Sequence, residues 1–336
     1  MRNPAWTIDF ARTATPVPTA VPEAPEAPAA HGEFRRDLRR ALAQWPRSMP
    51  PKYFYDARGS ALFDRICELP EYYPTRAELA ILRERAAEIA AQIGPHAEIV
   101  EFGAGSLTKV RLLLDALVAP RRYLPIDISG EHLGAAAHRL REDYPQLAVE
   151  PVVADYTRQF VLPPPEANGR RVGFFPGSTI GNFDPDEALR FLEHAAQLLR
   201  GGGLLLGADL VKNPATLHAA YNDAEGVTAA FNLNLLRRAN AELDCDFDLD
   251  GFSHCAFYNA PLRRIEMHLV SRRAQRVRLD GECFSFDEGD TLHTEISHKF
   301  TVEGLRGLAA RAGFRPAAVW TDDARRFSVH WLEAPT

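Results

Sequence analysis

The sequence predicts an α/β fold: a mostly parallel, seven-stranded sheet that ends in an antiparallel hairpin, with a second α+β domain beside it. Three observations support this prediction. Short apolar runs alternate with helical patterns between about residues 97 and 211, as in parallel sheets with right-handed helical crossovers. A glycine turn joins the first of these runs to a helix. The last two runs are separated only by residues 322–326, which is too short for a crossover, so they must pair as a hairpin.

The composition is that of a globular protein. The chain has 336 residues, 46% hydrophobic and 25% charged, enough for one large domain or two ordinary ones. A net charge of -6 argues against a nucleic-acid surface, and no apolar run reaches the length of a membrane helix. We expect no signal peptide, and the four cysteines show no pairing pattern, so they predict reduced thiols in the cytoplasm.

The N-terminal third begins with a segment of low structural content. Residues 1–32 are rich in Pro and Ala and predict a flexible tail. Apolar residues at helical spacing between Phe34 and Trp45 predict a first helix, and an aromatic segment follows. Thr75 and Glu78 match a capping box, which predicts one long helix through Ile93.

The sheet and its helices follow in order along the chain. Apolar runs predict seven strands, at 99–102, 123–128, 149–154, 172–175, 204–210, 317–321 and 327–332. Helical patterns between them predict helices at 109–117, 130–143, 185–199 and 302–312. A parallel sheet that ends in a hairpin is the class I (Rossmann-like) methyltransferase architecture, so residues 77–211 and 301–336 are assigned to that domain. Residues 33–76 and 212–300 are expected to form a substrate-binding domain over the carboxyl ends of the strands.

The turn after the first predicted strand selects the ligand class. Gly103 and Gly105 let the backbone turn tightly and approach a ligand closely. A dinucleotide fingerprint has a third small residue where this chain has Thr108. The Glu101 carboxylate would repel a phosphate but suits a cationic, amino-bearing ligand. We therefore predict an S-adenosylmethionine site that includes Glu101, Gly103 and Gly105, although an ordinary βα turn can also carry Gly-x-Gly.

Acidic residues follow two further strands. Asp127 stands at the end of the second predicted strand, where a carboxylate accepts hydrogen bonds from ribose hydroxyls. Asp155 ends the third strand, with Tyr156 beside it, where methyltransferases read the adenine amino group and cover the ring. Three strand ends that each carry an acid strengthen the prediction of S-adenosylmethionine over a plain structural turn.

Polar residues elsewhere suggest the methyl acceptor. Asn182, after the fourth strand, offers a donor and an acceptor to a small polar substrate, or holds only its own turn. Glu295 and Ser297 lie on one side of a predicted strand and could hold neutral imidazole, or belong to a solvated strand face. Tyr221 and Met267 could face a substrate or simply pack in the core.

Several blocks of this sequence resemble the L-histidine Nα-methyltransferases, the first enzymes of ergothioneine biosynthesis. The similarity runs from about residue 35 to the end. Ile296 and His298 depart from the family, which usually has Asn and Tyr there, and Tyr156 replaces a usual Phe. The resembling blocks are the glycine turn and residues 177–182, 207–212, 220–223, 229–234, 265–270 and 293–295.

The resemblance implies S-adenosylmethionine-dependent trimethylation of the α-amine of L-histidine to hercynine. It also implies three groups of site residues. The imidazole would contact Glu295 and Ser297 beside Met267, and the carboxylate would contact Asn182 and Tyr221. The amine would lie among Tyr55, Phe63, Tyr72 and the Gly177 backbone, with Tyr55, Gly177 and Asn182 nearest the chemistry. The cofactor would contact Gly103, Lys109, Asp127, Asp155 and Tyr156.

Three alternative functions remain open, and a metal, nucleic-acid binding and membrane binding are not expected. The alternatives are a methyltransferase for another amino acid such as tryptophan, a dinucleotide oxidoreductase, and a non-catalytic binding protein with this fold. His293 and His298 lack the spacing of a zinc motif, so no metal is expected. We expect a monomer whose partner is the small molecule L-histidine, without nucleic-acid or membrane binding.

Overall fold

The computed structural model describes residues 28–105, 107–128, 130–158, 160–165 and 169–336. The segment expected to be a flexible tail lies outside the described residues up to position 27. The first helix, α1 (Pro28–Ala43), begins before Phe34, where the apolar pattern starts. In the described part of the chain, no helix combines the length and apolar character needed to cross a membrane.

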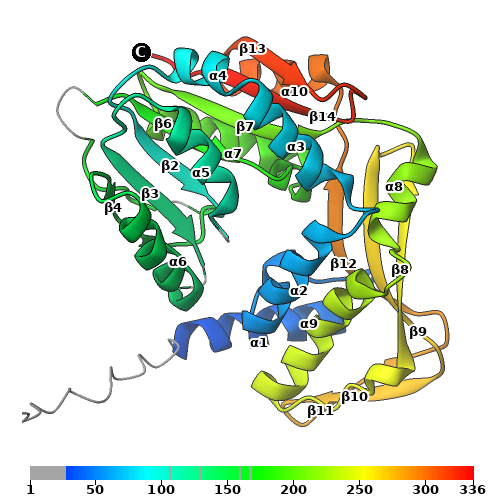
Figure 1. Ribbon diagram of the computed structural model, residues 1–336. Coiled ribbons are helices and arrows are strands. Elements are labelled where there is room, and N and C mark those ends of the chain that lie inside the picture. The colour runs from blue at the N-terminus through cyan, green and yellow to red at the C-terminus, as the bar shows by residue number, and fades with distance from the viewer. Residues whose placement is uncertain (1–27, 106, 129, 159, 166–168) are drawn as a thin grey trace, which may run out of the picture.

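The larger sheet has the architecture that the sequence predicts (Figure 1). Its strands follow the order β13-β14-β7-β6-β2-β3-β4, and β5 also pairs with β3. β14 runs antiparallel to β7 and β13, whereas the other neighbouring strands are parallel. The predicted fold class is therefore confirmed. The strands are β2 (Glu98–Phe102), β3 (Arg122–Asp127), β4 (Ala148–Val149), β5 (Val152–Val153), β6 (Arg171–Phe175), β7 (Gly203–Asp209), β13 (Arg315–Thr321) and β14 (Phe327–Glu333).

Helices cover both faces of this sheet and enclose two apolar cores. On one face, Ile89 and Leu113 pack in the core that also contains Tyr123 of β3. On the other, Leu192 and Leu305 pack together in a second core. The first group of helices is α3 (Tyr73–Glu84), α4 (Ala86–Ile93), α5 (Thr108–Ala116) and α6 (Gly130–Asp143), and the second is α7 (Pro185–Leu198) and α10 (Val302–Arg311).

The prediction of one strand over residues 149–154 is wrong. The structure has two short strands there, β4 and β5, separated by Glu150 and Pro151. A proline has no N–H to donate to a neighbouring strand, so it interrupts the pairing with β3. Asp155 nevertheless follows the second short strand, at the same edge of the sheet as Asp127.

The prediction of a capping box at Thr75 and Glu78 is also wrong. Helix α3 begins at Tyr73, two residues before Thr75, with Pro74 in its first turn and Tyr72 as its N-cap. Proline suits the first turn of a helix because its missing N–H is not needed there. The helix ends at Glu84, and α4 is a separate helix after Arg85. Glu78 therefore lies inside α3, and its side chain is free for another role.

A second unit lies opposite the carboxyl ends of β2 and β3 (Figure 1). It contains a four-stranded sheet in the order β1-β12-β9-β8. Because β1 pairs with β12, the two segments assigned to the second domain meet in one sheet. The exact domain division stays a prediction. The elements are β1 (Arg47–Ser48), η1 (Pro51–Phe54), α2 (Ala57–Glu68), α8 (Pro214–Tyr221), α9 (Val227–Leu243), η3 (Leu249–Gly251), β8 (Phe252–Asn259), β9 (Arg264–Ser271), β10 (Gln275–Leu279), β11 (Glu282–Phe286) and β12 (Thr291–His298).

Candidate active site

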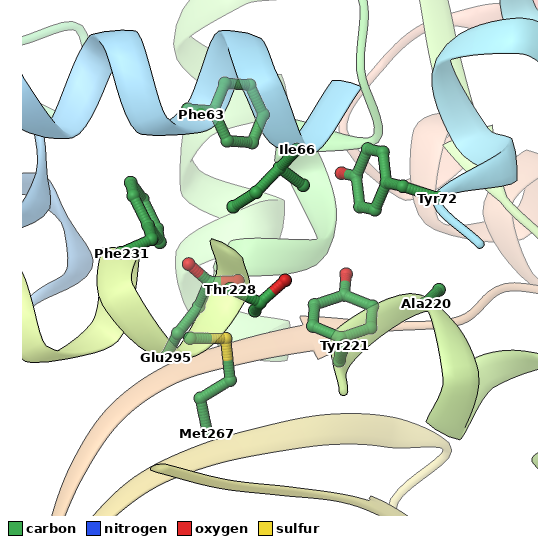
Figure 2. Close-up of a pocket in the computed structure, with 9 residues that line it drawn as sticks. All are labelled: Phe63, Ile66, Tyr72, Ala220, Tyr221, Thr228, Phe231, Met267 and Glu295. Carbon is green, nitrogen blue, oxygen red and sulfur yellow. The ribbon is translucent and has the colours of Figure 1, made fainter. Parts of the chain in front are cut away.

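A hollow in the second unit gathers several of the side chains expected to bind the substrate (Figure 2). It holds about 280 Å³ of space between atoms, part of which is open to solvent. Five of its lining residues were expected from the sequence and four were not. The expected ones are Phe63, Tyr72, Tyr221, Met267 and Glu295, and the others are Ile66, Ala220, Thr228 and Phe231.

Glu295 is the one charged side chain among these nine residues. The pairing of β12 with β9 shifts register between His293 and Glu295, so Thr294 is an extra residue that bends the strand. The buried Thr294 hydroxyl donates to the Asn232 Oδ1 at 2.7 Å, which fixes this bend. Figure 2 shows the Glu295 carboxylate facing the hollow above Met267. Burial raises the pKa of the Glu295 carboxyl to about 7, against the opposing charge of Lys299.

Ser297 does not line the hollow itself but joins its wall. The Tyr221 hydroxyl donates to Ser297 Oγ at 2.9 Å. The Lys299 ammonium donates to Ser297 Oγ at 2.8 Å and to the Tyr221 hydroxyl oxygen at 3.3 Å. The structure therefore brings Tyr221 and Ser297 together, around a buried lysine that the sequence analysis did not single out.

Aromatic rings form the opposite wall. Phe63 makes edge contacts with Tyr55 at 5.8 Å and with Tyr72 at 6.4 Å between ring centroids. Tyr72 in turn contacts Tyr221 at 6.3 Å. Burial, with a smaller contribution from nearby acidic groups, raises the pKa of the Tyr55 and Tyr72 phenols well above their usual value. Both phenols are therefore neutral and can donate hydrogen bonds but cannot act as bases near neutral pH.

The glycine turn after β2 has the backbone needed for close approach to a ligand. Gly103 and Gly105 both have positive φ angles, +73° and +50°. A Cβ at Gly103 would lie 3.3 Å from the Tyr156 hydroxyl oxygen, so the turn and Tyr156 face each other across a narrow space. The Gly105 N–H donates to Asp127 Oδ2 at 3.3 Å. A glycine turn without side chains, the Asp127 carboxylate and the Tyr156 ring together fit a nucleoside ligand.

Gly103→Ala is expected to weaken S-adenosylmethionine binding at least tenfold. Alanine at this position would have to keep the positive φ angle, which L residues rarely adopt. Its methyl group would also lie against the Tyr156 hydroxyl. Isothermal titration calorimetry with S-adenosylmethionine measures the affinity of the variant. Gly134→Ala is the matched control, because a Cβ at this helical glycine meets no atom within 4 Å. Equal affinities of the two variants would remove Gly103 from the cofactor site.

A buried carboxylate connects the cofactor turn with the loop after β6. Glu78 of α3 is 1% exposed, and both its oxygens accept the Gly177 N–H, at 3.0 and 2.9 Å. Its Oε2 also pairs with Lys109 Nζ at 2.7 Å. The sequence analysis missed this role of Glu78. An available signal was its position on the face of α3 that also carries Ile81 and Leu82, where a charge needs a partner.

Glu101 lies under the turn rather than in it. It is 2% exposed, and its carboxylate accepts a hydrogen bond from the Tyr123 hydroxyl. Burial raises the pKa of the Glu101 carboxyl to about 8, although the Tyr123 bond and the Lys109 charge lower it. With a pKa of about 8, the Glu101 carboxyl is mostly protonated near neutral pH, and its role in binding the cofactor stays a prediction.

Asp155 stands at the other end of the candidate cofactor site. Its Oδ2 is 3.4 Å from Lys52 Nζ of η1, and its Oδ1 accepts the Thr157 N–H at 3.0 Å. Burial acts to raise the pKa of Asp155, but the bond from Thr157 and the charge of Lys52 outweigh it and lower the pKa. The ionised carboxylate therefore remains an acceptor for an amino group. Tyr156 packs beside it on Phe102 and Phe175.

The loop after β6 places Gly177 and Asn182 at the border between the two units. Gly177 has a φ of +79°, and a Cβ there would lie 3.2 Å from Lys109 Nζ. Asn182 ends the short helix η2 (Thr179–Asn182) and is half-buried. A Cβ at Gly181 would lie 2.8 Å from the His298 carbonyl oxygen, so η2 packs directly against β12. Neither Gly177 nor Asn182 lines the hollow.

Asp209, at the end of β7, is a further buried acid that the sequence analysis missed. Its carboxylate is 1% exposed and accepts the Tyr73 hydroxyl at 2.7 Å. It pairs with Lys212 at 2.6 Å and with Lys299 at 3.1 Å. The signal was present in the sequence, because Asp209 ends an apolar strand in the same way as Asp127.

One group of possible metal ligands occurs among the described residues. Glu266, His268 and His293 place one ligand atom each within 4.8 Å of one another. Glu266 and His268 flank Met267 on β9, so they lie on the face opposite the hollow. The two imidazole rings stack at 4.7 Å, and Arg264 donates to Glu266 at 2.8 Å.

Comparisons with known proteins give a family match and several similar sequences. Residues 34–334 match the model of a family described as "Histidine-specific methyltransferase, SAM-dependent". The chain is 46% identical to a histidine N-alpha-methyltransferase of Mycolicibacterium smegmatis, over 88% of this chain and 93% of that protein. It is 30% identical to a 4-dimethylallyltryptophan N-methyltransferase of Epichloe festucae var. lolii, over 87% of this chain and 92% of that protein.

A solved structure with a similar backbone is the CcbJ methyltransferase of Streptomyces caelestis. It shares 15% sequence identity with this chain, and the alignment covers 76% of this chain and 90% of that one with a TM-score of 0.44.

Proposed function

The chain belongs to the histidine-specific, S-adenosylmethionine-dependent methyltransferases, and we propose that it transfers three methyl groups in succession to the α-amine of L-histidine. The product is hercynine, the trimethyl betaine, and the reaction is the first step of ergothioneine biosynthesis. The observation that carries the proposal is Glu295, a half-buried carboxylate in a hollow that is otherwise lined by apolar and hydroxyl-bearing side chains.

Glu295 and Ser297 bind the imidazole ring in this proposal. A neutral imidazole has one N–H donor and one acceptor nitrogen. The ionised Glu295 carboxylate accepts the ring N–H, and the Ser297 hydroxyl donates to the other nitrogen. Met267, which pairs with Glu295 across the two strands, packs beside the ring. An amino acid without this N–H would leave a half-buried carboxylate unpaired, which disfavours its binding.

The other groups of histidine meet the remaining wall. Asn182 and the Tyr221 hydroxyl hold the carboxylate, and the Gly177 backbone orients the amine. Tyr55, Phe63 and Tyr72 surround the amine with ring faces and edges. The faces of aromatic rings attract quaternary ammonium groups, so this wall accommodates each more methylated amine.

The residues that would hold S-adenosylmethionine are Gly103, Lys109, Asp127, Asp155 and Tyr156. When bound, it would supply an electrophilic methyl group on a positively charged sulfur and would leave as S-adenosylhomocysteine. The amine can attack only after losing its proton, and a free α-amine does so at modest cost near neutral pH. Tyr55 and Tyr72 keep their protons, so the chain contributes alignment of the amine rather than a strong base there. Such positioning accounts for a large share of rate enhancement in reactions of this type.

Histidine affinity is expected to rise at least tenfold between pH 6 and pH 8. Glu295, with a pKa of about 7, must be ionised, and the ligand imidazole, with a pKa of about 6.5, must be neutral. Both conditions fail together as the pH falls. Titration of histidine into the enzyme with S-adenosylhomocysteine present measures the affinity without turnover. A rise of about fourfold or less would mean that ionisation of Glu295 does not contribute to histidine binding.

Glu295→Gln is the control for this pH profile. The amide cannot titrate, so only the imidazole of the ligand changes charge, and the expected change shrinks to about fourfold. The same tenfold rise in Glu295→Gln as in the wild type would assign the pH dependence to another group.

A tryptophan-type amino acid is the alternative acceptor. Indole has an N–H but no acceptor nitrogen, and it is wider than imidazole. Glu295 could accept the indole N–H, but the Ser297 hydroxyl would then face a ring carbon. A non-catalytic binding protein is the second alternative, and it would bind histidine without methylating it. We expect the enzyme to act as a monomer in the cytoplasm.

The position of the transferred group tests the proposal. Incubation of the full chain with histidine and S-adenosylmethionine carrying a ¹³C methyl group, followed by NMR of the product, distinguishes the α-nitrogen from the ring nitrogens. We expect the label on the α-nitrogen and, at completion, three equivalent methyl groups. Label on an imidazole nitrogen would overturn the assigned orientation of histidine in the hollow.

A further inference from the structure

Three acceptor oxygens surround the Lys299 ammonium, one for each of its three hydrogens. An ammonium group has three N–H donors and no acceptor. Lys299 Nζ lies 3.1 Å from Asp209 Oδ2, 2.8 Å from Ser297 Oγ and 3.3 Å from the Tyr221 Oη. Its side chain is 1% exposed, so no water competes freely for these hydrogens. The lysine therefore acts as a donor to both hydroxyl oxygens at once.

This arrangement determines what the two hydroxyl groups can do. A hydroxyl has one hydrogen and two lone pairs. Lys299 occupies one lone pair on each oxygen, and its ammonium group has no lone pair, so neither hydroxyl can donate its hydrogen to the lysine. In the structure the Tyr221 hydroxyl donates to Ser297 Oγ, which accepts from Lys299 as well. Both lone pairs of Ser297 Oγ are then in use, and its hydrogen must point elsewhere.

We infer that Lys299 is a positioning residue that fixes the hydroxyls of Ser297 and Tyr221 as hydrogen-bond donors to the substrate. The inference rests on the proposed function and deepens it. When the substrate binds, the Tyr221 hydrogen turns from Ser297 Oγ to the carboxylate of the amino acid. Lys299 keeps one lone pair of each hydroxyl oxygen, and Ser297 donates to the acceptor nitrogen of the imidazole. Lys299 thereby selects substrates with a hydrogen-bond acceptor in the ring and another at the carboxylate, although Lys299 itself contacts neither the ring nor the carboxylate.

Asp209 makes this inference testable without loss of the fold. The Asp209 carboxylate is also bound by Lys212 at 2.6 Å and by the Tyr73 hydroxyl at 2.7 Å. Removing Lys299 therefore leaves Asp209 paired, not an isolated buried charge. Lys212 is the matched control. Its ammonium pairs with the same carboxylate but has no recorded contact with Ser297 or Tyr221 among the described side chains.

The test compares Lys299→Met with Lys212→Met in the full chain. Steady-state kinetics are measured with histidine and with the 2- and 3-pyrrolyl isomers of alanine, which keep a ring N–H but lack the acceptor nitrogen. We expect Lys299→Met to raise KM for histidine at least tenfold, and to lower the selectivity for histidine over pyrrolylalanine at least tenfold. Lys212→Met should stay within about threefold of the wild type in both quantities.

The selectivity ratio separates positioning from a merely structural role. A general loosening of the site would lower turnover of both substrates and leave their ratio unchanged. An unchanged ratio in Lys299→Met, or the same loss in Lys212→Met, would therefore overturn the inference. If Lys299→Met does not fold, Lys299→Arg keeps the charge toward Asp209 but cannot place its donors on the same three oxygens, and the same loss of selectivity is expected.

A second measurement checks that Lys299 acts through Ser297. In a Ser297→Ala background, Lys299→Met should reduce selectivity at least threefold less than in the wild type, because the two residues share one interaction. If the effects of Lys299→Met and Ser297→Ala on selectivity are fully additive, Lys299 does not act through Ser297. A wild-type enzyme that neither binds nor methylates histidine overturns the proposed function itself, whereas normal activity with selectivity unmoved by Lys299→Met overturns only the role of Lys299.

Discussion

Replacing Glu295 by alanine is expected to lower kcat/KM for histidine by about 10²- to 10³-fold and to leave S-adenosylmethionine binding unchanged. The substitution removes the one charged group of the hollow, and with it the partner of the ring N–H. Gly103 and Asp127, which we propose to bind the cofactor, lie in the larger sheet and its glycine turn and should keep their geometry. Initial rates with varied histidine, and a titration with the cofactor, measure the two effects separately.

Glu295→Gln serves as the control that keeps the shape of the side chain. Its amide oxygen can still accept a neutral hydrogen bond, so we expect an intermediate loss of about tenfold. Wild-type kcat/KM in Glu295→Ala would place the imidazole elsewhere. An equal loss of cofactor affinity would show instead that the substitution damages the fold.

Replacing Glu78 by alanine is expected to have the second largest effect, on stability and activity together. The change leaves Lys109 without its carboxylate partner and the Gly177 N–H without its acceptor. Breaking a buried ion pair in this way lowers the free energy of unfolding by about 3 kcal/mol. The displaced loop should also lower kcat/KM by about 10²-fold, because small shifts of a positioned group are costly.

Glu84→Ala is the matched control, since Glu84 lies exposed on the same helix, α3. Its unfolding midpoint in urea and its kinetics should equal those of the wild type. Glu78→Gln separates the two roles, because the amide still accepts the Gly177 N–H but carries no charge for Lys109. If Glu78→Ala behaves like Glu84→Ala, the carboxylate does not join the cofactor turn to the loop after β6.

The fold could be predicted from local sequence patterns because each strand and helix of the larger sheet carries its own signal. Strands β2, β6 and β7 are buried along their whole length and read as apolar runs. The short link between β13 and β14 excluded a helical crossover. The errors were local: Pro151 interrupts a strand, and Tyr73 rather than Thr75 opens the helix that contains Glu78.

The candidate site was less accessible from sequence, because its charges meet only in three dimensions. Glu78 and Gly177 are 99 positions apart, and Tyr221 and Ser297 are 76 apart. No local pattern marks such pairs. Glu295 and Ser297 could be singled out because they alternate on one strand, whereas Lys299 follows that strand and gains its partners only when β12 approaches Asp209. The roles assigned to the site residues stay predictions.

The most direct test of the central claim is a comparison of amino acids as methyl acceptors. The purified chain is incubated with S-adenosylmethionine and each of the twenty amino acids in turn, and the products are examined by mass spectrometry. The account predicts that histidine gains one, two and then three methyl groups while tryptophan and the other amino acids remain unchanged. Methylation of tryptophan in preference to histidine, or no methylation of histidine, would contradict it.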